Sequence, residues 1–350
     1  MNRIKLGFVG CGFNGQIGFI QNFYKNKNCK ISGIAEARTK LLKKVSTKYK
    51  VRNQYSSHSD LIKNITKFDA IIIVTKREMM PAIAYDFLKF KKPLLTEKPV
   101  ASTLEQAKKL LKAASRVKTP FKIGYNKTYD EGIEKGKLIF DKLVKDKTFG
   151  NLIYIRSHRL SGSGYDPKNS YISTNEKNFL KNPSWPPKPR WLPKKYTKSY
   201  SKYLNLYCHN INLLKFFTKK NPQIKFSNLS DKSMSTVFLN YGKYYAILET
   251  GFFTKKGWDE TLEIYFEKGH IKIVLPPQHK KNISSKVFVY DNGKNKVTQK
   301  YSFKSWSFKR QTDDFIKDIK NQKVKKNNLS SAVEDMKVVE QIWKKFIFKS

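Results

Sequence analysis

The stretch IKLGFVGCGFNG, residues 4–15, decides the fold of the first part of this chain. Its first six residues form an apolar run typical of a buried strand, and Gly10, Gly12 and Gly15 follow in the pattern G-x-G-x-x-G. The first glycine permits a tight turn, the second lets the backbone approach a pyrophosphate, and the third lets the next helix pack on the strand. The stretch therefore predicts a strand, a glycine turn and a helix N-terminus that holds a dinucleotide.

An acidic residue at the end of the second predicted strand, residues 31–35, indicates which dinucleotide is bound. Glu36 favours NAD, because it can accept hydrogen bonds from ribose hydroxyls and would repel a 2′-phosphate. Arg38 favours a 2′-phosphate instead, so NADP is the alternative to NAD. The predicted cofactor-binding residues are Gly10, Gly12, Phe13, Asn14, Gly15, Glu36, Arg38, Thr75, Lys76, Arg77, Glu97 and Lys98.

Short apolar runs alternate with helical stretches over the first third of the chain. Further strands are predicted at 69–75, 93–96 and 121–124, and helices at about 13–26, 38–48, 81–90 and 103–114. Thr103 precedes Gln106 by a capping-box spacing, which marks the start of the last of these helices. This alternation predicts an α/β Rossmann domain, a doubly wound parallel sheet, over residues 1–124.

The rest of the chain has a different order of elements. Strands are predicted near 234–240, 244–254, 260–267, 270–275 and 285–291, and helices near 203–217, 306–320 and 330–347. Strands in succession followed by helices predict a C-terminal α+β domain on an open, mostly antiparallel sheet over residues 125–350. Residues 162–202 form a long loop around the run WPPKPRWLP, residues 185–193. This loop is either a structured crossover or a flap over a substrate pocket, in which case Trp191 contacts the substrate.

The stretch TEKPVASTLEQA, residues 96–107, resembles the Gfo/Idh/MocA oxidoreductase family when it is taken with the glycine pattern. The resemblance covers essentially the whole chain. It implies a Rossmann domain followed by a domain whose open sheet packs against another subunit, in a homodimer or homotetramer. It also implies that Lys98 assists proton transfer or orients the reacting hydroxyl. Hydride transfer between nicotinamide and a carbinol carbon needs such a group independently of the resemblance.

The stretch NLYCHNIN, residues 205–212, resembles the family's D-x-x-x-H-x-x-D segment. The resemblance implies that His209 is the general acid or base. Asn205 and Asn212 stand where the family has aspartate, and an amide can orient a hydroxyl but cannot take its proton. The three residues share one helical face. The other interpretation of His209 is a structural histidine on a helix.

Two further positions are candidate substrate contacts. In GYNKTYD, residues 124–130, which resembles a family segment at the domain junction, Lys127 either contacts substrate or a carboxylate, or lies at a solvated helix start. Arg156 and His158 face one way on the next strand, where they either meet an anionic substrate or form a surface pair.

Composition limits the other classes of function. Of 350 residues, Lys+Arg number 71 and Asp+Glu 27, which gives a net charge of +44. The charge is mostly lysine and spread along the chain, so we attribute it largely to genome composition and predict no specific nucleic-acid partner. No apolar run is long enough for a membrane helix, and the three cysteines have no metal-site spacing. We expect a cytoplasmic protein without a metal or a membrane partner.

The predicted function is hydride transfer between NAD and a carbinol or carbonyl carbon of a small sugar-type substrate: a sugar, a cyclitol or a nucleotide sugar. Two alternatives stay open. One is a glycosidase or lyase that holds NAD permanently and oxidises a carbon transiently. The other is a non-catalytic NAD-binding regulator, which the asparagine at 205 makes conceivable.

Overall fold

The structure, a computed structural model, describes residues 3–162, 170–176, 184–230, 234–252 and 257–348. Its contacts divide the chain into two compact units. Unit 1 comprises Met1–Tyr125, Pro167–Asn205 and Phe308–Met336, and unit 2 comprises Asn126–Asp166, Leu206–Ser307 and Lys337–Ser350. Two segments beyond residue 124 thus group with unit 1. A grouping of contacts does not test independent folding, so the division into domains 1–124 and 125–350 stays a prediction.

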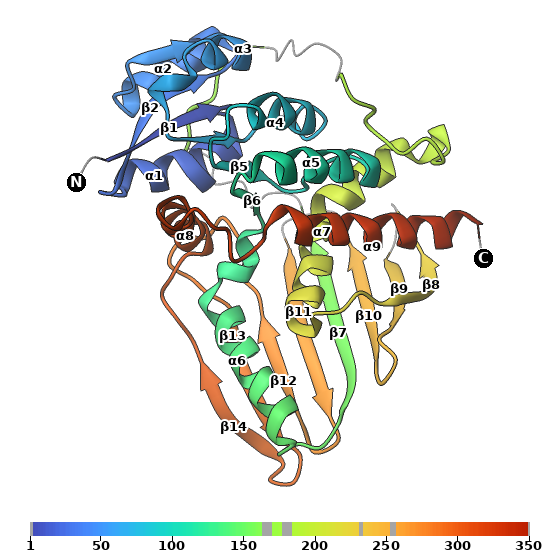
Figure 1. Cartoon of the computed structure of the whole chain (residues 1–350). Helices are drawn as coiled ribbons and strands as arrows, with labels where there is room; N and C mark the ends of the chain where they lie inside the picture. Colours follow the sequence, from blue (N-terminus) through green and yellow to red (C-terminus); the bar gives the residue numbers. More distant parts are fainter. Residues whose placement is uncertain (1–2, 163–169, 177–183, 231–233, 253–256, 349–350) are drawn as a thin grey trace. The chain divides into compact units, whose positions relative to one another are not determined.

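Unit 1 is built on a six-stranded parallel sheet (Figure 1), as the Rossmann prediction requires. Its strands are β1 (Ile4–Val9), β2 (Cys29–Ala35), β3 (Asn53–Tyr55), β4 (Ala70–Ile73), β5 (Leu94–Glu97) and β6 (Phe121–Gly124). The strand order is β3-β2-β1-β4-β5-β6. The order reverses between β1 and β4, and ligands of such sheets bind at the carboxyl ends of the strands beside this reversal.

The helices of unit 1 connect these strands. They are η1 (Gly15–Ile20), α1 (Gln21–Lys25), α2 (Thr39–Lys48), α3 (His58–Ile62), η2 (Ile65–Lys67), α4 (Met80–Leu88) and α5 (Leu104–Val117). The single helix predicted at 13–26 is two pieces, a π-helical turn η1 followed by α1. The predicted cap of α5 is present, since the Thr103 side chain accepts the backbone N–H of Gln106 at 3.1 Å.

A later segment of the chain completes the core of unit 1. Helix α8 (Ser307–Asn321) packs on η1 and α1 through ring contacts of Phe308 with Phe19 and of Phe315 with Phe23. A Cβ on Gly18 would lie 2.7 Å from the Phe308 ring, so glycine is needed for this close approach. Lys122 of β6 is fully buried and forms ion pairs with Asp314 and Asp318 of α8.

Unit 2 contains an eight-stranded mixed sheet of order β14-β13-β12-β11-β7-β10-β9-β8, in which only β7 and β10 pair in parallel among the described strands. The strands are β7 (Leu152–Ser161), β8 (Gln223–Asn228), β9 (Ser235–Asn240), β10 (Tyr245–Gly251), β11 (Trp258–Phe266), β12 (Gly269–Val274), β13 (Lys286–Asp291) and β14 (Lys296–Tyr301). The mostly antiparallel sheet confirms the predicted class of this part of the chain.

One face of this sheet is covered by α6 (Glu131–Asp146), which follows the turn η3 (Asn126–Tyr129) and packs on β12 and β13 (Figure 1). Buried and half-buried residues alternate along β12, so Ile271 and Ile273 lie on one face, and His270 and Lys272 on the other. Ile273 contacts the helix at Gly136, where there is no room for a Cβ. The isoleucines therefore face α6.

The remaining helices are η4 (Lys194–Tyr196), α7 (Thr197–Thr218) and α9 (Leu329–Phe348). The predicted start of α7 at 203 was wrong, because its first turns, TKSYSK, are polar and carry no apolar period. Strands β8 and β14 were not predicted. They are edge strands with mostly exposed side chains, and such strands lack the alternation by which strands are identified.

Candidate functional site

The glycine turn after β1 has the geometry that a bound pyrophosphate requires. Gly10 has a φ of +92° and lies against the Val74 carbonyl, so no side chain fits there. A Cβ on Gly15 would lie 2.9 Å from the Gly10 carbonyl oxygen. At Gly12 the nearest group is the Arg38 guanidinium, 3.3 Å from a Cβ position. The turn is therefore rigid at its two ends and open at Gly12, where the backbone can approach a ligand.

A cavity of about 360 Å³ lies at the carboxyl ends of β1, β2, β4 and β5, and its volume is within the range of ligand sites. All twelve predicted cofactor-binding residues line it. The other lining residues are Val9, Ala35, Ala37, Ser56, Ser57, His58, Val74, Met80, Ile83 and Asn205. The structure thus brings the predicted set together in one cavity within unit 1, although binding itself stays a prediction.

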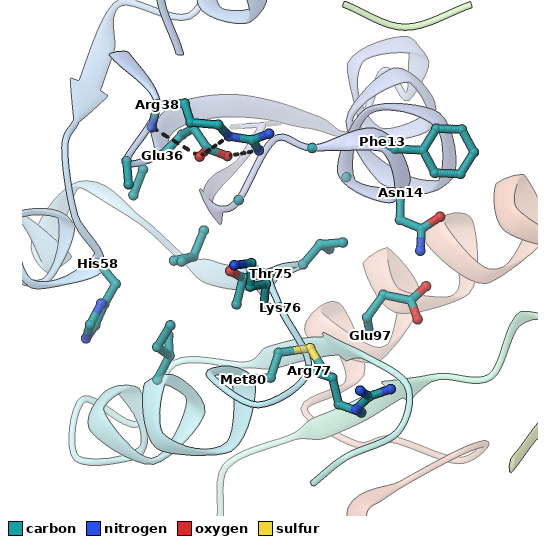
Figure 2. Close-up of a pocket in the computed structure, with 18 of the residues that line it drawn as sticks. Phe13, Asn14, Glu36, Arg38, His58, Thr75, Lys76, Arg77, Met80 and Glu97 are labelled. Carbon is teal, nitrogen blue, oxygen red and sulfur yellow. Dashed lines mark hydrogen bonds and ion pairs between the residues drawn. The ribbon is translucent and has the colours of Figure 1, made fainter. Parts of the chain in front are cut away.

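The two ends of the cavity differ in chemistry. Figure 2 shows Glu36 and Arg38 at one end, Asn14 and Glu97 at the other, and Thr75 and Lys76 between them. The side-chain oxygen of Asn14 is buried and has no hydrogen-bond partner among the described residues. An unpaired buried acceptor costs free energy unless a ligand satisfies it. The cavity therefore offers a polar group that a bound dinucleotide can use.

Glu36 and Arg38 form a bidentate ion pair. The guanidinium donates from Nε to Oε1 at 2.9 Å and from Nη2 to Oε2 at 3.0 Å. Oε2 also accepts the backbone N–H of Cys11 at 3.1 Å, which ties the end of β2 to the glycine turn. Burial alone would raise the pKa of Glu36, but the bonds from Arg38 and Cys11 outweigh it and hold the pKa below its usual range. Glu36 is therefore ionised at neutral pH.

Lys98 and Asn205, two of the predicted catalytic residues, lie together in unit 1. The Lys98 ammonium donates to the backbone oxygen of Asn205 at 2.6 Å and to its side-chain oxygen at 3.2 Å. Glu97 is buried beside them and accepts the Lys98 backbone N–H at 2.9 Å. Burial raises the pKa of Glu97 to about 7, although the positive charge of Lys98 opposes the rise. This end of the cavity thus holds an amine, an amide and a carboxyl that titrates near neutrality.

Two lining residues, Arg77 and His58, show what sequence reasoning did not resolve. Arg77 donates to the Ser201 carbonyl oxygen at 2.9 Å and pairs with Glu78, so it anchors the start of α7 as well as lining the cavity. His58 lines the cavity and lies 3.2 Å from Asp86. The sequence offered one indication of the structure around His58, a helix cap at Ser57. The Ser57 side chain accepts the Asp60 N–H at 3.1 Å, and α3 begins at His58.

The other predicted substrate contacts belong to unit 2. Lys127 is only 5% exposed and pairs with the buried carboxylate of Glu260, with the Trp258 ring 5.9 Å away. The interpretation as a solvated helix start is therefore wrong, and the contact with a carboxylate is confirmed. Whether Lys127 also touches substrate stays a prediction.

Helix α7 carries Asn205, His209 and Asn212, as predicted, and the last two belong to unit 2 and are buried. This part of α7 is fixed on both sides of His209. Arg159 donates to the Leu206 carbonyl oxygen at 2.6 Å, and Asn210 donates to Ser157 at 3.3 Å. The imidazole of His209 thus sits on a helix whose position is held by the sheet of unit 2.

Arg156 is paired within its own sheet. Its guanidinium donates to Glu249 at 2.6 Å and to Glu263 at 3.4 Å, and His158 lies between Glu249 at 3.1 Å and Asp259 at 3.2 Å. This arrangement favours the surface-pair interpretation, and a contact of Arg156 with an anionic substrate stays only a prediction.

The tryptophan- and proline-rich loop contacts the helices of unit 1. Trp185 lies 5.5 Å from the Tyr85 ring of α4, Lys109 of α5 lies over both rings, and Gln106 donates to the Pro186 carbonyl oxygen at 2.6 Å. These contacts favour a structured crossover over residues 184–193. Trp191 is half-buried and is not among the residues that line the cavity. Its contact with substrate stays a prediction.

The described residues contain neither a membrane-spanning helix nor a cluster of metal ligands. No helix there is long and apolar enough to span a membrane. Within the same residues, no group of three or more His, Cys, Asp or Glu side chains is arranged to hold a metal ion.

The fold and the glycine turn define unit 1 as a dinucleotide-binding Rossmann domain. Comparison with known proteins bears on this part of the chain: residues 4–125 match the GFO_IDH_MocA profile, described as an oxidoreductase family with an NAD-binding Rossmann fold. The match confirms, for these residues, the resemblance to the Gfo/Idh/MocA family and the predicted class of cofactor. A curated relative, the uncharacterized oxidoreductase YrbE of Bacillus subtilis (strain 168), is 24% identical over 139 residues, which are 40% of this chain and 40% of YrbE.

Solved structures show that the fold extends over the whole chain. A Desulfitobacterium hafniense protein described as a "putative NADPH-dependent oxidoreductase" aligns with a TM-score of 0.81 at 14% identity, over 100% of this chain and 97% of its own. The aldose–aldose oxidoreductase of Caulobacter crescentus aligns with a TM-score of 0.77 at 13% identity, over 100% and 99% of the two chains. At these identities the likeness concerns the fold alone.

Proposed function

We propose that this protein is an NAD-dependent oxidoreductase that transfers a hydride between nicotinamide and a carbinol or carbonyl carbon of a sugar, a cyclitol or a nucleotide sugar. The observation that carries the proposal is the Lys98–Asn205 pair, which lies in the same cavity as the glycine turn. An amine and an amide beside a dinucleotide site can hydrogen-bond a substrate hydroxyl and assist the gain or loss of its proton.

The cofactor is proposed to be NAD. Its nicotinamide supplies a hydride acceptor or donor when it is bound. Gly12 would lie against the pyrophosphate, and the ionised carboxylate of Glu36 stands at the end of β2, where the adenosine ribose binds in Rossmann domains. A fixed negative charge there disfavours a 2′-phosphate.

The proton is proposed to be handled by Lys98 and His209. Lys98 is held by Asn205 in an orientation that leaves its amine at the cavity wall. His209 is buried on a fixed stretch of α7 and is the residue that the family resemblance assigns as general acid or base. Asn205 is proposed to orient the substrate hydroxyl, since its amide cannot accept the proton.

The partner is proposed to be a second copy of the chain, bound through the sheet of unit 2. Four rings form a continuous row across its strands, with centroids 5.9, 5.1 and 4.3 Å apart: Tyr154, Tyr265, His270 and Tyr290. They lie on the face of β12 opposite the isoleucines that contact α6. Aromatic residues are enriched in the cores of protein interfaces. Light scattering that finds a monomer at micromolar concentration would contradict this assignment.

The function is tested in two stages. Calorimetry measures binding of NAD⁺ and NADH to the full chain, and a panel of sugars, cyclitols and nucleotide sugars is then assayed for NADH formation. Steady NADH formation with a member of the panel supports the proposal. Substrate conversion without release of NADH favours the alternative enzyme with permanently held NAD, and no uptake of either dinucleotide removes the proposal.

A further inference from the structure

The carboxylate of Glu176 binds the N-terminus of α2, although Glu176 and α2 are far apart in the sequence. The described segment Ser170–Glu176 belongs to unit 1, as does α2. One oxygen of Glu176 accepts the backbone N–H of Lys40 and the other that of Leu41, both at 2.9 Å. The Thr39 hydroxyl adds a third bond at 3.3 Å. Glu176 therefore serves as the N-terminal cap of α2.

Helix α2 has no cap from its own sequence. The side chain of its N-cap residue, Arg38, makes no capping bond, and its first turn carries no acidic residue. Unpaired N–H groups and the helix dipole make such an end attractive to anions. Partial burial alone would raise the pKa of Glu176, but the two backbone N–H groups outweigh it and hold the pKa below its usual range. An internal anion therefore occupies this helix end at neutral pH.

The segment that carries Glu176 is also fixed at its other end. Gln16 and Ile172 exchange two hydrogen bonds, from Ile172 N–H at 2.8 Å and from Gln16 Nε2 at 2.9 Å. The Tyr171 ring packs edge-on against Phe13 at 5.0 Å. Thr174 donates to the Glu176 carboxylate at 2.9 Å. The carboxylate is thus held in place by several contacts, all of them within unit 1.

The position of this helix end matters for the choice of dinucleotide. Residues at the end of β2 and the start of α2 surround the 2′ position of the adenosine ribose in Rossmann domains. Arg38, the cavity residue that could pair with a 2′-phosphate, already pairs with Glu36, and the charge of Glu176 acts on it as well. The guanidinium therefore pairs with one carboxylate and interacts electrostatically with a second. A phosphate of charge about −1.5 to −2 would meet these two carboxylates, and the Lys40 and Leu41 N–H groups are already bonded to Glu176.

We propose that Glu176 is a specificity-determining residue: it occupies the anion-binding end of α2 and makes the site select NAD over NADP. The inference rests on the proposed function, because it requires that the cavity binds the dinucleotide. Glu176 lies outside the glycine turn and outside β2. The family profile ends at residue 125 and does not include it, and no sequence pattern indicates it.

The test is calorimetric titration of the full-length protein with NAD⁺ and with NADP⁺. The informative variant is Glu176→Gln, which keeps the length of the side chain and removes its charge. Glu176→Ala, which removes the carboxylate altogether, is measured beside it in case one variant does not fold. Glu105→Gln is the matched control, since it removes an exposed carboxylate from the first turn of α5, outside the cavity. Thr174→Val removes a bond to Glu176 and keeps the charge.

The wild-type protein is expected to bind NAD⁺ more tightly than NADP⁺. Loss of the Glu176 charge is expected to raise the affinity for NADP⁺ about tenfold and to change the affinity for NAD⁺ by less than about threefold. Glu105→Gln and Thr174→Val are expected to leave the ratio of the two affinities unchanged.

Three results would overturn the inference. One is an unchanged ratio in both neutral variants of Glu176. Another is an equal loss of both affinities, which would mark Glu176 as merely structural. The third is a wild-type preference for NADP⁺. Absence of binding of either dinucleotide to the wild-type protein would overturn the proposed function as well, so the two failures are distinguishable.

Discussion

Arg38 donates two parallel hydrogen bonds to Glu36, and the acceptor sites of that carboxylate are full. Each oxygen accepts one bond from the guanidinium, and in addition one accepts the Cys11 N–H at 3.1 Å and the other the Arg38 N–H at 3.2 Å. A carboxylate has about four acceptor positions. A ribose hydroxyl can therefore bond to Glu36 only if Arg38 shifts. We expect the Glu36–Arg38 ion pair to rearrange when the dinucleotide binds.

Arg38→Ala is expected to lower the free energy of unfolding by about 1–3 kcal/mol at pH 7, because it removes charge-assisted bonds from a buried carboxylate. The lowered pKa of Glu36 means that its ionised form stabilises the folded state at neutral pH. This stabilisation is lost as the pH falls through the folded-state pKa, so the difference between wild type and variant should shrink below pH 4. Urea unfolding at several pH values measures it.

The control for this experiment is Arg52→Ala, which removes an exposed arginine. It should change stability little at any pH. An Arg38→Ala penalty that is the same at pH 3 and pH 7 would contradict the assignment of the effect to the ionised carboxylate.

The cofactor end of the cavity could be predicted from the sequence because its residues follow strands in short, regular patterns. Gly10, Glu36 and Lys98 each come directly after a strand of the sheet, and parallel strands bring such positions to one edge. The contact of Glu176 with α2 has no such pattern, since it joins segments 135 residues apart. His58 was missed for a related reason: β3 has only three residues, too few to show a period.

Glu97 should make stability depend on pH in the opposite direction from Glu36. Its pKa in the folded protein is about 7, above the ordinary value of 4.5, because the carboxyl is buried. The folded state favours the protonated carboxyl. Its contribution to the free energy of unfolding is therefore complete below about pH 4.5 and is lost as the pH rises through about 7. Relative to Glu97→Gln, which does not titrate, the wild-type protein should lose about 3 kcal/mol between pH 4.5 and pH 8.

Urea unfolding of both proteins without cofactor, at matched pH values, measures this difference. Parallel stability curves over that range would show that Glu97 is already ionised in the folded protein at acid pH, and that the carboxyl is more hydrated than its burial indicates.

Lys122 should be needed to keep α8 on the sheet of unit 1. It is fully buried, and its partner Asp318 is 6% exposed. Lys122→Met removes the positive charge and leaves a buried carboxylate without its ion pair, which costs about 3–5 kcal/mol. The double variant Lys122→Met/Asp318→Asn removes the charge of Asp318 as well, so it should recover a large part of that loss. A double-mutant cycle by thermal or urea unfolding measures the coupling.

The pair Lys309–Asp313, on the same helix, is the matched control when its exposed lysine is replaced in Lys309→Met, because solvent screens that charge. Its removal should cost less than about 1 kcal/mol. If the cost at Lys122 were as small as this, the buried pair would not anchor α8.

Lys98 should matter far more for turnover than for binding of the dinucleotide, although it lines the cofactor cavity. Its amine bonds to Asn205, and its neighbour Glu97 lies at the end of the cavity opposite Glu36 and Arg38 (Figure 2), so the adenosine contacts are not expected to depend on Lys98. With a substrate identified in the NADH assay, Lys98→Met is expected to lower kcat about 10²–10⁴-fold, the range for loss of a positioned proton-transfer group. Calorimetry should show an NAD⁺ affinity within about threefold of wild type, since the lost group acts on the substrate hydroxyl.

Lys98→Arg keeps the charge but cannot release a proton at neutral pH, so it should bind NAD⁺ and remain inactive. Activity in Lys98→Arg close to wild type would show that the charge at this position suffices and would leave the proton transfer to His209.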